Sequence, residues 1–356
     1  MRESRLSGAR RERIEASPQF ADGRFHNAAP STGVATPSFR TMWDFFFKRG
    51  RRVPRGPIPL VSPLEAWARP SEKLRATWLG HSTVLIELAG RRVLTDPVFG
   101  ERASPLGLMG PRRFHAPPVP VEALPDLDLV VLSHDHYDHL CNTTLRALAK
   151  RRVPIVTALG VGARLERLGW DPGLITELDW QEHMELGPLR VTATPAQHFS
   201  GRGVSDRNRT LWSSFVIESA DERVFFSGDS GFTEAFGEIG QRHGPFDLVM
   251  IEVGAFHPNW AAIHMGPENA LKVQALLRGE LLLPIHWSTF NLALHDWDEP
   301  AEVLMREAAG AGRRVATPLI GEPFSPRRVE RMTPWWRAVD AVEVPLAAVE
   351  AQNSGT

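Results

Sequence analysis

His134-Asp135-His136-Tyr137-Asp138-His139 is the stretch of this chain that decides the fold. It directly follows an apolar run, residues 128–133, whose composition predicts a buried strand. Two histidines separated by one residue can reach one ion from an extended or turning backbone, whereas a helical surface would favour spacings of three or four. Asp138 and His139 lie further along and can reach a second ion. The stretch therefore predicts a metal site at the end of a strand, in preference to a polar loop whose histidines are only hydrogen-bonded.

Further ligands for two metal sites are expected from later strands. His198, Asp229 and His286 each come just after an apolar run that we expect to form a strand. Any one of them could be a satisfied structural residue, but together they place metal-binding side chains at several strand ends, where open sheets carry their sites. Imidazoles and carboxylates, with no thiolate required, suit a binuclear site. The residues identify the ligands but do not assign them to separate ions.

The order of these residues resembles the metallo-β-lactamase fold, and Asp96, after an early strand, also fits. Flanking segments narrow the resemblance to the N-acylphosphatidylethanolamine-hydrolysing phospholipase D branch, from about Arg75 to Phe324. The segments that carry it are 77–87 (TWLGHSTVLIE), 102–105 (RASP), 109–114 (MGPRRF), 195–198 (PAQH), 211–215 (LWSSF), 244–248 (GPFDL) and 285–290 (IHWSTF). The resemblance implies an α/β fold, a metallo-β-lactamase-like αββα sandwich of two mixed β-sheets flanked by helices. One departure is Asp135, which stands where the family tends to carry Asn.

The resemblance also implies how the metals are held. The first zinc would be bound by His134, His136, His198 and Asp229. The second would be bound by Asp138, His139, His286 and Asp229, which bridges the two. Asp96 would brace the His-rich loop by hydrogen bonds, and His81 is a second supporting residue or a purely structural one. We therefore expect two Zn²⁺ per chain, although this donor set also suits other divalent metals.

Two metals close together make hydroxide available near neutral pH and polarise a phosphoryl or carbonyl oxygen. The metal motif predicts metal-assisted hydrolysis but does not separate attack on phosphorus from attack on a carbonyl carbon. The resemblance implies a phosphodiesterase of phospholipase D type that acts on N-acylphosphatidylethanolamine-like phospholipids. The alternative is a sugar-phosphate lactonase-like or other hydrolase of the same fold. A non-catalytic, metal-stabilised binding module is more remote because none of the ligands is missing.

Asp138 and His264 are the candidate catalytic residues. His264 precedes an expected helix in the segment IHMGP, 263–267, at a family position near the metals. We expect it to donate a proton to the leaving group or to orient the substrate. The alternative is a histidine that caps or packs at the helix start.

The loop 99–118 is the candidate substrate-binding segment. It places Leu108 and Met109 beside Arg112 and Arg113. An apolar lip with guanidinium groups would suit an acyl chain that carries a phosphate, because Arg binds phosphate bidentately. The alternative is a loop packed on its own domain with solvated arginines.

Composition limits the remaining classes of function. A formal net charge of −1 gives no electrostatic case for a nucleic-acid partner. The single cysteine, Cys141, excludes an intramolecular disulfide and is expected to be a small buried residue. No apolar stretch approaches the length of a membrane span. We expect a small-molecule or phospholipid substrate and a cytoplasmic protein, with peripheral membrane contact and a homodimer left open.

The chain divides into four expected segments: 1–40 without regular structure, 41–74 an aromatic, basic and Pro-rich extension, 75–324 the hydrolase domain, and 325–356 a partly disordered C-terminal extension. Residues 1–13 are basic but lack the apolar core of a secretory signal. Trp43, Phe45, Phe46 and Phe47 either dock on the domain or contact a membrane surface together with the basic residues after them. Helices are expected at 143–150, 161–169, 267–279 and 299–309.

Overall fold

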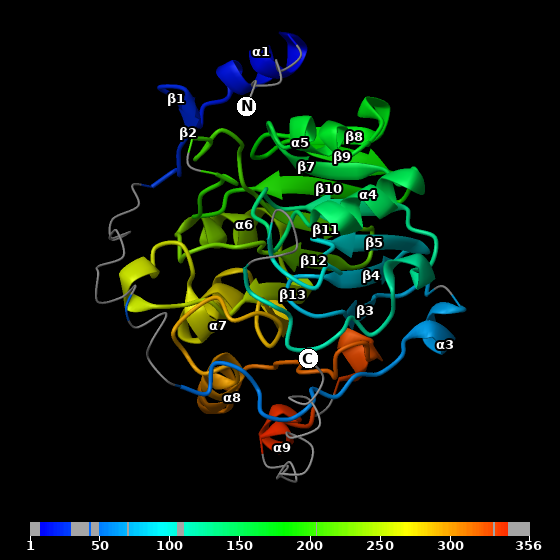
Figure 1. Ribbon diagram of the computed structural model, residues 1–356, viewed down its shortest axis with the longest axis vertical. Coiled ribbons are helices and arrows are strands. Elements are labelled where there is room, and N and C mark those ends of the chain that lie inside the picture. The colour runs from blue at the N-terminus through cyan, green and yellow to red at the C-terminus, as the bar shows by residue number, and fades with distance from the viewer. Residues whose placement is uncertain are drawn as a thin grey trace, which may run out of the picture.

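Two β-sheets lie face to face, and helices cover their outer faces (Figure 1). The computed structural model describes residues 8–29, 43, 50–69, 71–104, 110–203, 205–329 and 332–340. The larger hydrophobic core contains buried residues of both sheets, such as Ile86 of one and Val249 of the other. A second core contains Val130 of the first sheet and Leu145 of the helix that covers it. The αββα sandwich predicted from the sequence is confirmed.

The first sheet has seven strands in the order β15-β3-β4-β5-β6-β7-β8. Its strands are β3 (Arg75–Trp78), β4 (Val84–Leu88), β5 (Arg91–Thr95), β6 (Leu129–Leu132), β7 (Ile155–Ala158), β8 (Ile175–Leu178) and β15 (Pro323–Phe324). Strands β5 to β8 run parallel to one another, and β15, β3 and β4 pair antiparallel. Every residue of β6 is buried, as expected for a strand covered on both faces.

The second sheet has six strands in the order β14-β13-β12-β11-β10-β9. Its strands are β9 (His183–Leu186), β10 (Leu189–Thr194), β11 (Ser214–Glu218), β12 (Arg223–Phe226), β13 (Phe246–Glu252) and β14 (Gly279–Ile285). Strands β12, β13 and β14 are parallel, and the remaining pairs are antiparallel. Both sheets are therefore mixed.

Helices supply the crossovers between the parallel strands. The α-helices of the described residues are α1 (Gly8–Ala16), α3 (Leu64–Trp67), α4 (Asn142–Lys150), α5 (Gly162–Arg167), α6 (Ala235–His243), α7 (Gly266–Leu276), α8 (Glu299–Ala311) and α9 (Trp336–Val339). Short 3-10 turns cover Val121–Ala123, Pro172–Leu174, Pro258–Trp260 and Pro326–Arg328. α6 connects β12 to β13 and α7 connects β13 to β14, while α4 connects β6 to β7. Among the described residues, no helix is long and apolar enough to cross a membrane.

The four expected helices are present with shifted ends. The largest shift is at α7, which ends at Leu276 instead of continuing to Gly279. Gly279 begins β14 and pairs with Phe246 of β13. A Cβ at this position would lie 2.7 Å from a methyl carbon of Val249, so glycine permits the close approach of the two strands.

The N-terminal segment differs from its sequence prediction. Residues 8–29 form α1 and a short hairpin of β1 (Phe20–Ala21) and β2 (Arg24–Phe25). Phe25 is completely buried, and the guanidinium of Arg10 pairs with Glu166 of α5 and Glu177 of β8. Figure 1 shows α1 at the top of the molecule, near α5. The prediction of no regular structure for 1–40 is therefore wrong for 8–29, because side-chain partners distant in sequence hold this polar segment.

Both extensions contribute to the fold. In the N-terminal extension, Trp67 is buried and donates a hydrogen bond to Thr77 of β3. Of the aromatic run, only Trp43 is described, and it is 53% exposed, whereas Phe45, Phe46 and Phe47 lie outside the described residues. In the C-terminal extension, Trp336 is completely buried and its indole donates to Glu302 of α8.

Candidate metal centre

Strand direction brings the candidate ligands to one edge of the sandwich. β5 and β6 are parallel, so their carboxyl ends deliver Asp96 and the stretch 134–139 to the same edge. Val84 pairs with Thr95, which places the β3–β4 turn, and His81 with it, at that edge as well. In the second sheet, β10, β12 and β14 all run in one direction and are followed by the other three candidate ligands, His198, Asp229 and His286. The common strand direction within each sheet and the face-to-face packing of the two sheets thus explain why residues far apart in sequence meet.

The first cluster contains the side chains of His134, His136, His198 and Asp229. His136 Nδ1 lies 2.8 Å from His134 Nε2 and 3.3 Å from His198 Nε2. Asp229 Oδ2 lies 3.9 Å from His134 Nε2 and 3.7 Å from His198 Nε2. Ligand atoms that each lie about 2 Å from a shared zinc ion have this kind of mutual spacing. The cluster can therefore hold one metal ion.

The second cluster contains Asp138, His139 and His286 and again meets Asp229. Asp229 Oδ2 lies 3.1 Å from His139 Nε2 and 3.2 Å from His286 Nε2. Asp138 Oδ2 lies 3.6 Å from His139 Nε2, 3.3 Å from His286 Nε2 and 3.1 Å from His81 Nε2. Nε2 of His139, Nε2 of His286 and Oδ1 of Asp229 are buried without a hydrogen-bond partner in the described part of the chain. Buried polar atoms normally have partners, and a second metal ion would provide one.

Charge in the two clusters is unevenly distributed. Burial opposes ionisation of Asp229, but His139 and His286 outweigh it and hold the pKa of Asp229 well below its usual range. Burial likewise opposes protonation of His286, but the carboxylates of Asp229 and Asp138 raise its pKa to about 10. The ionised carboxylates of Asp229 and Asp138 thus favour positive charge beside the imidazole rings, supplied either by protonation of the rings or by metal ions.

Asp96 supports the second cluster by hydrogen bonds to Ser133 and to the ring nitrogen of His139 that faces away from the cluster. Its carboxylate accepts hydrogen bonds from the backbone N–H of Ser133 at 2.7 Å and from the Ser133 hydroxyl at 2.6 Å. Nδ1 of His139 donates to Asp96 Oδ2 at 2.6 Å. This bond places the proton on Nδ1 and leaves the Nε2 lone pair directed at the cluster. The predicted bracing role of Asp96 therefore has a direct geometric basis.

The backbone of the centre adopts costly conformations. His81, Asp96 and His286 have φ values of 51°, 30° and 64°, in the left-handed region that non-glycine residues rarely occupy. Gly228 has a φ of 54°, and a Cβ on it would lie 2.6 Å from Cβ of Ser133. Gly228 thus allows the end of β12 to approach the end of β6, which carries Asp229 to the histidines.

His264 lies at the edge of the centre and has a buried partner. Its Nδ1 lies 2.7 Å from Oε2 of Glu252, the last residue of β13, and its ring lies 5.1 Å from that of His198. Burial opposes protonation of His264, but the Glu252 carboxylate outweighs it and raises the pKa of His264. Glu252 was not predicted as a site residue, although its position at the end of an apolar strand, like that of the other site residues, was the available signal.

A pocket of about 330 Å³ opens over both clusters. It is lined by His136, Asp138, Phe199, Arg207, Asp229, Ala255, Trp260, Ile263, His264, His286 and Leu292. The Arg207 guanidinium stacks on the Phe199 ring, 4.5 Å from its centroid. The neighbouring carboxylate of Asp206 pairs with Arg164, and no carboxylate of the described residues forms an ion pair with Arg207. The pocket thus combines metal-binding groups, an available cation and an apolar wall.

The predicted substrate contacts Arg112 and Arg113 do not line this pocket. Arg112 is exposed and pairs with Glu101 at 2.8 Å. Arg113 is buried and donates to the carbonyl oxygens of Val98 at 2.6 Å and His115 at 3.2 Å. Carbonyl partners turn the Arg113 guanidinium inward, so we no longer assign a phosphate to either residue. Leu108 and Met109 lie outside the described residues.

Asp135 joins the His-rich loop to a neighbouring loop. Its carboxylate accepts from Arg164 at 2.6 Å and from the backbone N–H of Gly201 at 2.8 Å. Arg164 also donates to Asp206 at 2.7 Å. An Asn at position 135 could not balance the charge of Arg164. Asp135, which departs from the family pattern, is thus paired with the nearby charge of Arg164.

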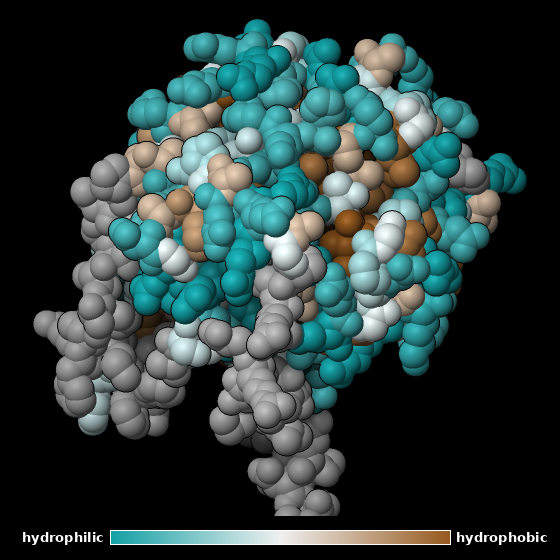
Figure 2. Space-filling model, turned by 90° about the horizontal axis from the view of Figure 1, so that it is seen from above, coloured by the Kyte–Doolittle hydropathy of each residue, from teal (hydrophilic) through white to brown (hydrophobic). Residues whose placement is uncertain are grey.

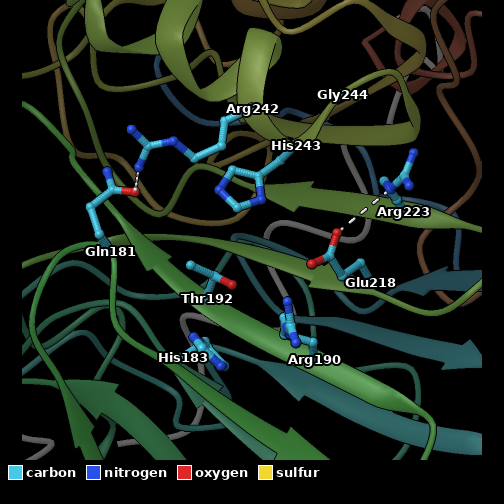
Figure 3. A pocket seen from close by; sticks show the side chains of 9 residues that line it. All are labelled: Gln181, His183, Arg190, Thr192, Glu218, Arg223, Arg242, His243 and Gly244. Carbon is cyan, nitrogen blue, oxygen red and sulfur yellow. Dashed lines mark hydrogen bonds and ion pairs between the residues drawn. The ribbon is translucent and has the colours of Figure 1, made fainter.

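A second pocket of similar size lies away from the metal centre (Figure 3). Its arginines already have side-chain partners: Arg223 pairs with Glu218 at 3.5 Å, and Arg242 donates to Gln181. Arg190 pairs with Glu185 at 2.7 Å. None of the candidate site residues lines this pocket.

A family model described as a β-lactamase superfamily domain matches residues 91–287. An uncharacterized protein of Mycobacterium bovis is 42% identical over 330 residues, covering 91% of this chain and 88% of that protein. The N-acyl-phosphatidylethanolamine-hydrolyzing phospholipase D 1 of Caenorhabditis elegans is 39% identical over 236 residues, covering 63% of this chain and 66% of that protein. The mitochondrial N-acyl-phosphatidylethanolamine-hydrolyzing phospholipase D of Saccharomyces cerevisiae is 31% identical over 258 residues, covering 69% of this chain and 54% of that protein.

Solved structures share the fold at lower identity. An isothiocyanate hydrolase from Delia radicum gut bacteria has a TM-score of 0.57 at 24% identity, covering 70% of this chain and 98% of that one. A metallo hydrolase from Ignicoccus hospitalis has a TM-score of 0.54 at 22% identity, covering 70% of this chain and 97% of that one. Fold and site together define a metal-dependent hydrolase. The chain belongs to the β-lactamase superfamily and has the metallo-β-lactamase fold. The predicted resemblance to the phospholipase D branch is confirmed by the two phospholipase relatives.

Proposed function

We propose that this protein is a binuclear zinc-dependent phosphodiesterase of phospholipase D type that acts on N-acylphosphatidylethanolamine-like phospholipids. The observation that carries the proposal is the position of Asp229, which belongs to the first donor cluster and lies within 3.2 Å of His139 and His286 of the second, beneath a pocket lined by the guanidinium of Arg207. Two divalent cations held there would supply a nucleophilic water near neutral pH and neutralise charge on the phosphoryl oxygens. The names of the phospholipase relatives support the choice of a phosphodiester.

The pocket offers separate contacts for the two chemical parts of such a substrate. Arg207 presents a planar guanidinium suited to two phosphate oxygens. Trp260, Ile263 and Leu292 present apolar surface suited to an acyl chain. We assign to Arg207 the phosphate-binding role that the sequence had suggested for Arg112 and Arg113.

His264 is placed to manage the proton of the leaving group. It lines the pocket, and Glu252 holds its Nδ1, so Nε2 is the ring nitrogen left to face a substrate. Proton transfer from Nε2 to the departing head-group oxygen would complete cleavage of the bond between that oxygen and phosphorus. Asp138 would hold a cation, and the contact of its carboxylate with His81 Nε2 would fix the orientation of that carboxylate.

The test is a hydrolysis screen of zinc-loaded protein with bis-p-nitrophenyl phosphate, vesicles containing N-acylphosphatidylethanolamine, and a panel of lactones. We expect turnover of the phosphodiesters and its loss in Asp138→Asn and His286→Ala. Arg207→Gln should raise KM by about 10-fold or more, the value of one charge-assisted contact of about 1.5–3 kcal/mol, whereas Arg112→Gln should leave KM unchanged. Turnover of lactones alone would replace this proposal with the lactonase-like alternative.

A phospholipid substrate implies contact with a membrane surface, and we propose that this contact is peripheral. The exposed large hydrophobic side chains of the described residues are Trp43, Val53, Leu60 and Leu64. The face seen in Figure 2 is largely hydrophilic, with hydrophobic residues gathered in a few patches. Trp43→Ser should weaken co-sedimentation with phospholipid vesicles, and unchanged binding would argue against a role for this residue.

A further inference from the structure

The described N-terminal segment lies directly against the loop that carries His198. The main chain of His198 lies beyond the end of β10, where the ladder with β11 has stopped. Both of its backbone hydrogen bonds in the described part of the chain are made by one side chain, the carboxamide of Asn27. Asn27 Nδ2 donates to the carbonyl oxygen of His198 at 2.9 Å, and the backbone N–H of His198 donates to Asn27 Oδ1 at 3.1 Å.

The contact holds a carboxamide in a single orientation. Asn27 Oδ1 also accepts from the indole of Trp212 at 3.0 Å, so the oxygen and nitrogen of the amide cannot exchange places without losing bonds. Gln197 donates to the carbonyl oxygen of Ala29 at 3.3 Å, which adds a second link beside the first. The amide of Asn27 thus replaces the missing strand partner of His198.

The ring of His198 is held independently of its backbone. Nδ1 of His198 lies 2.9 Å from the carbonyl oxygen of Ile263 and donates to it, which leaves Nε2 facing His136 and Asp229. Two fixed points, the main chain and Nδ1, determine where Nε2 lies. Without Asn27, the main chain of His198 would lose both of these hydrogen bonds and would be held only through its neighbour Gln197, which bonds to Ser230 and Gly231.

The hairpin that carries Asn27 is itself firmly attached. The backbone N–H of Phe25 donates to the carbonyl oxygen of Asn208 at 2.8 Å, and Asn208 Nδ2 donates back to Phe25 at 3.1 Å. Asn208 adjoins Arg207, so the hairpin holds both the loop of a candidate ligand and the loop of the proposed phosphate contact. Phe25 is completely buried and anchors the hairpin in the second core.

We propose that Asn27 is a positioning residue of the metal centre: its side-chain amide fixes the main chain of His198 and thereby the place of Nε2 in the first cluster. The N-terminal segment is accordingly part of the centre and not an appendage to the domain. This inference rests on the metal centre of the proposed function, but it does not depend on the identity of the substrate.

Metal binding is the direct test. Removing groups that orient a ligand lowers metal affinity by about 10- to 100-fold. Asn27→Ala should weaken the binding of one of two metal ions by such a factor in a chelator competition and shift the visible spectrum of the cobalt-substituted protein. His26→Ala is the matched control, because the neighbouring ring bonds within the same hairpin, to the carbonyl oxygen of Ala21 at 3.1 Å, and makes no hydrogen bond to the metal centre in the described part of the chain. Wild-type affinity and an unchanged cobalt spectrum in Asn27→Ala would overturn the inference.

Two further measurements keep the inference testable if Asn27→Ala does not fold. Asn27→Asp keeps the acceptor for His198 N–H but loses the donor, so its cobalt spectrum should shift less than that of Asn27→Ala. In the wild-type protein, the His198 amide should be strongly protected from hydrogen exchange, and rapid exchange would count against the contact. Wild-type protein that binds metal but does not cleave phosphodiesters would defeat the proposed function alone.

Discussion

Replacing Asp96 by Asn tests how the protein orients a metal ligand without touching the metal. Asp96 is completely buried and accepts three short hydrogen bonds, two from Ser133 and one from His139 Nδ1. An Asn side chain keeps only one oxygen acceptor and directs an NH₂ group at the remaining donors. If the oxygen keeps the bond to Ser133 N–H, the NH₂ group faces His139 Nδ1 and favours the tautomer with its proton on Nε2. That tautomer has no lone pair for a metal.

The expected magnitude follows from the bonds that are lost. A buried hydrogen bond to a charged group contributes about 1.5–3 kcal/mol, so the free energy of unfolding of the metal-free variant should fall by about that amount. Loss of an orienting partner should weaken binding of the second metal by about 10- to 100-fold. Urea unfolding measures the first quantity, and competition with a chromophoric chelator measures the second.

Asp128→Asn is the matched control for this experiment. Asp128 lies at the opposite end of β6, where it accepts from Arg91 at 2.8 Å and from the backbone N–H of Arg92 at 2.9 Å. Its replacement removes charge from the same strand but should leave metal affinity unchanged. If Asp96→Asn binds both metals as tightly as the wild type, the orienting role of Asp96 is refuted.

Three other changes have defined outcomes. Gly228→Ala should lower the free energy of unfolding, measured in urea, by about 2–4 kcal/mol, because the new Cβ strains the left-handed backbone and clashes with Ser133. The control Gly310→Ala lies in α8 with open space around it and should be neutral or slightly stabilising. Equal effects of the two changes would contradict the close approach of β12 and β6. His264→Gln should reduce kcat by about 100-fold or more with full metal content, and an unchanged kcat would remove its proton-donor role. Burial and, to a lesser extent, the charge of Arg113 lower the pKa of His115 to about 3. Between pH 6.5 and 3, His115 is therefore protonated in the unfolded chain but neutral in the folded chain. The free energy of unfolding should fall by up to about 1.4 kcal/mol for each unit by which the pH drops through this range. His115→Gln should therefore lose stability less steeply than the wild type in urea titrations between pH 6.5 and 5, and identical slopes would refute this.

The candidate ligands could be predicted because each follows a strand whose apolar pattern is local in sequence. Once these strands are recognised, their common direction within each sheet places the ligands of that sheet at one edge. The two edges then meet because the two sheets pack face to face. The expected αββα architecture follows from the same alternation of strands and helices.

Other features depend on contacts that no local pattern contains. Residues 8–29 are polar, and their structure depends on the burial of Phe25 and on carboxylates of α5 and β8. The basic loop before Phe114 suggested a phosphate site, but Val98 and His115 supply carbonyl partners that turn Arg113 inward. Arg207 went unpredicted for the converse reason: its exposure to the pocket depends on the course of a loop, which the sequence pattern does not determine.

The central claim is the proposal that the residues around Asp229 would hold two metal ions and that the protein would hydrolyse a phosphodiester there. The most direct measurement is a titration of zinc into metal-free protein while the hydrolysis of bis-p-nitrophenyl phosphate is followed. Activity should rise to a plateau at two equivalents of metal per chain and should be absent at every loading in Asp229→Asn. A plateau at one equivalent, or wild-type activity in Asp229→Asn, would contradict the binuclear centre, and no hydrolysis at any loading would contradict the phosphodiesterase.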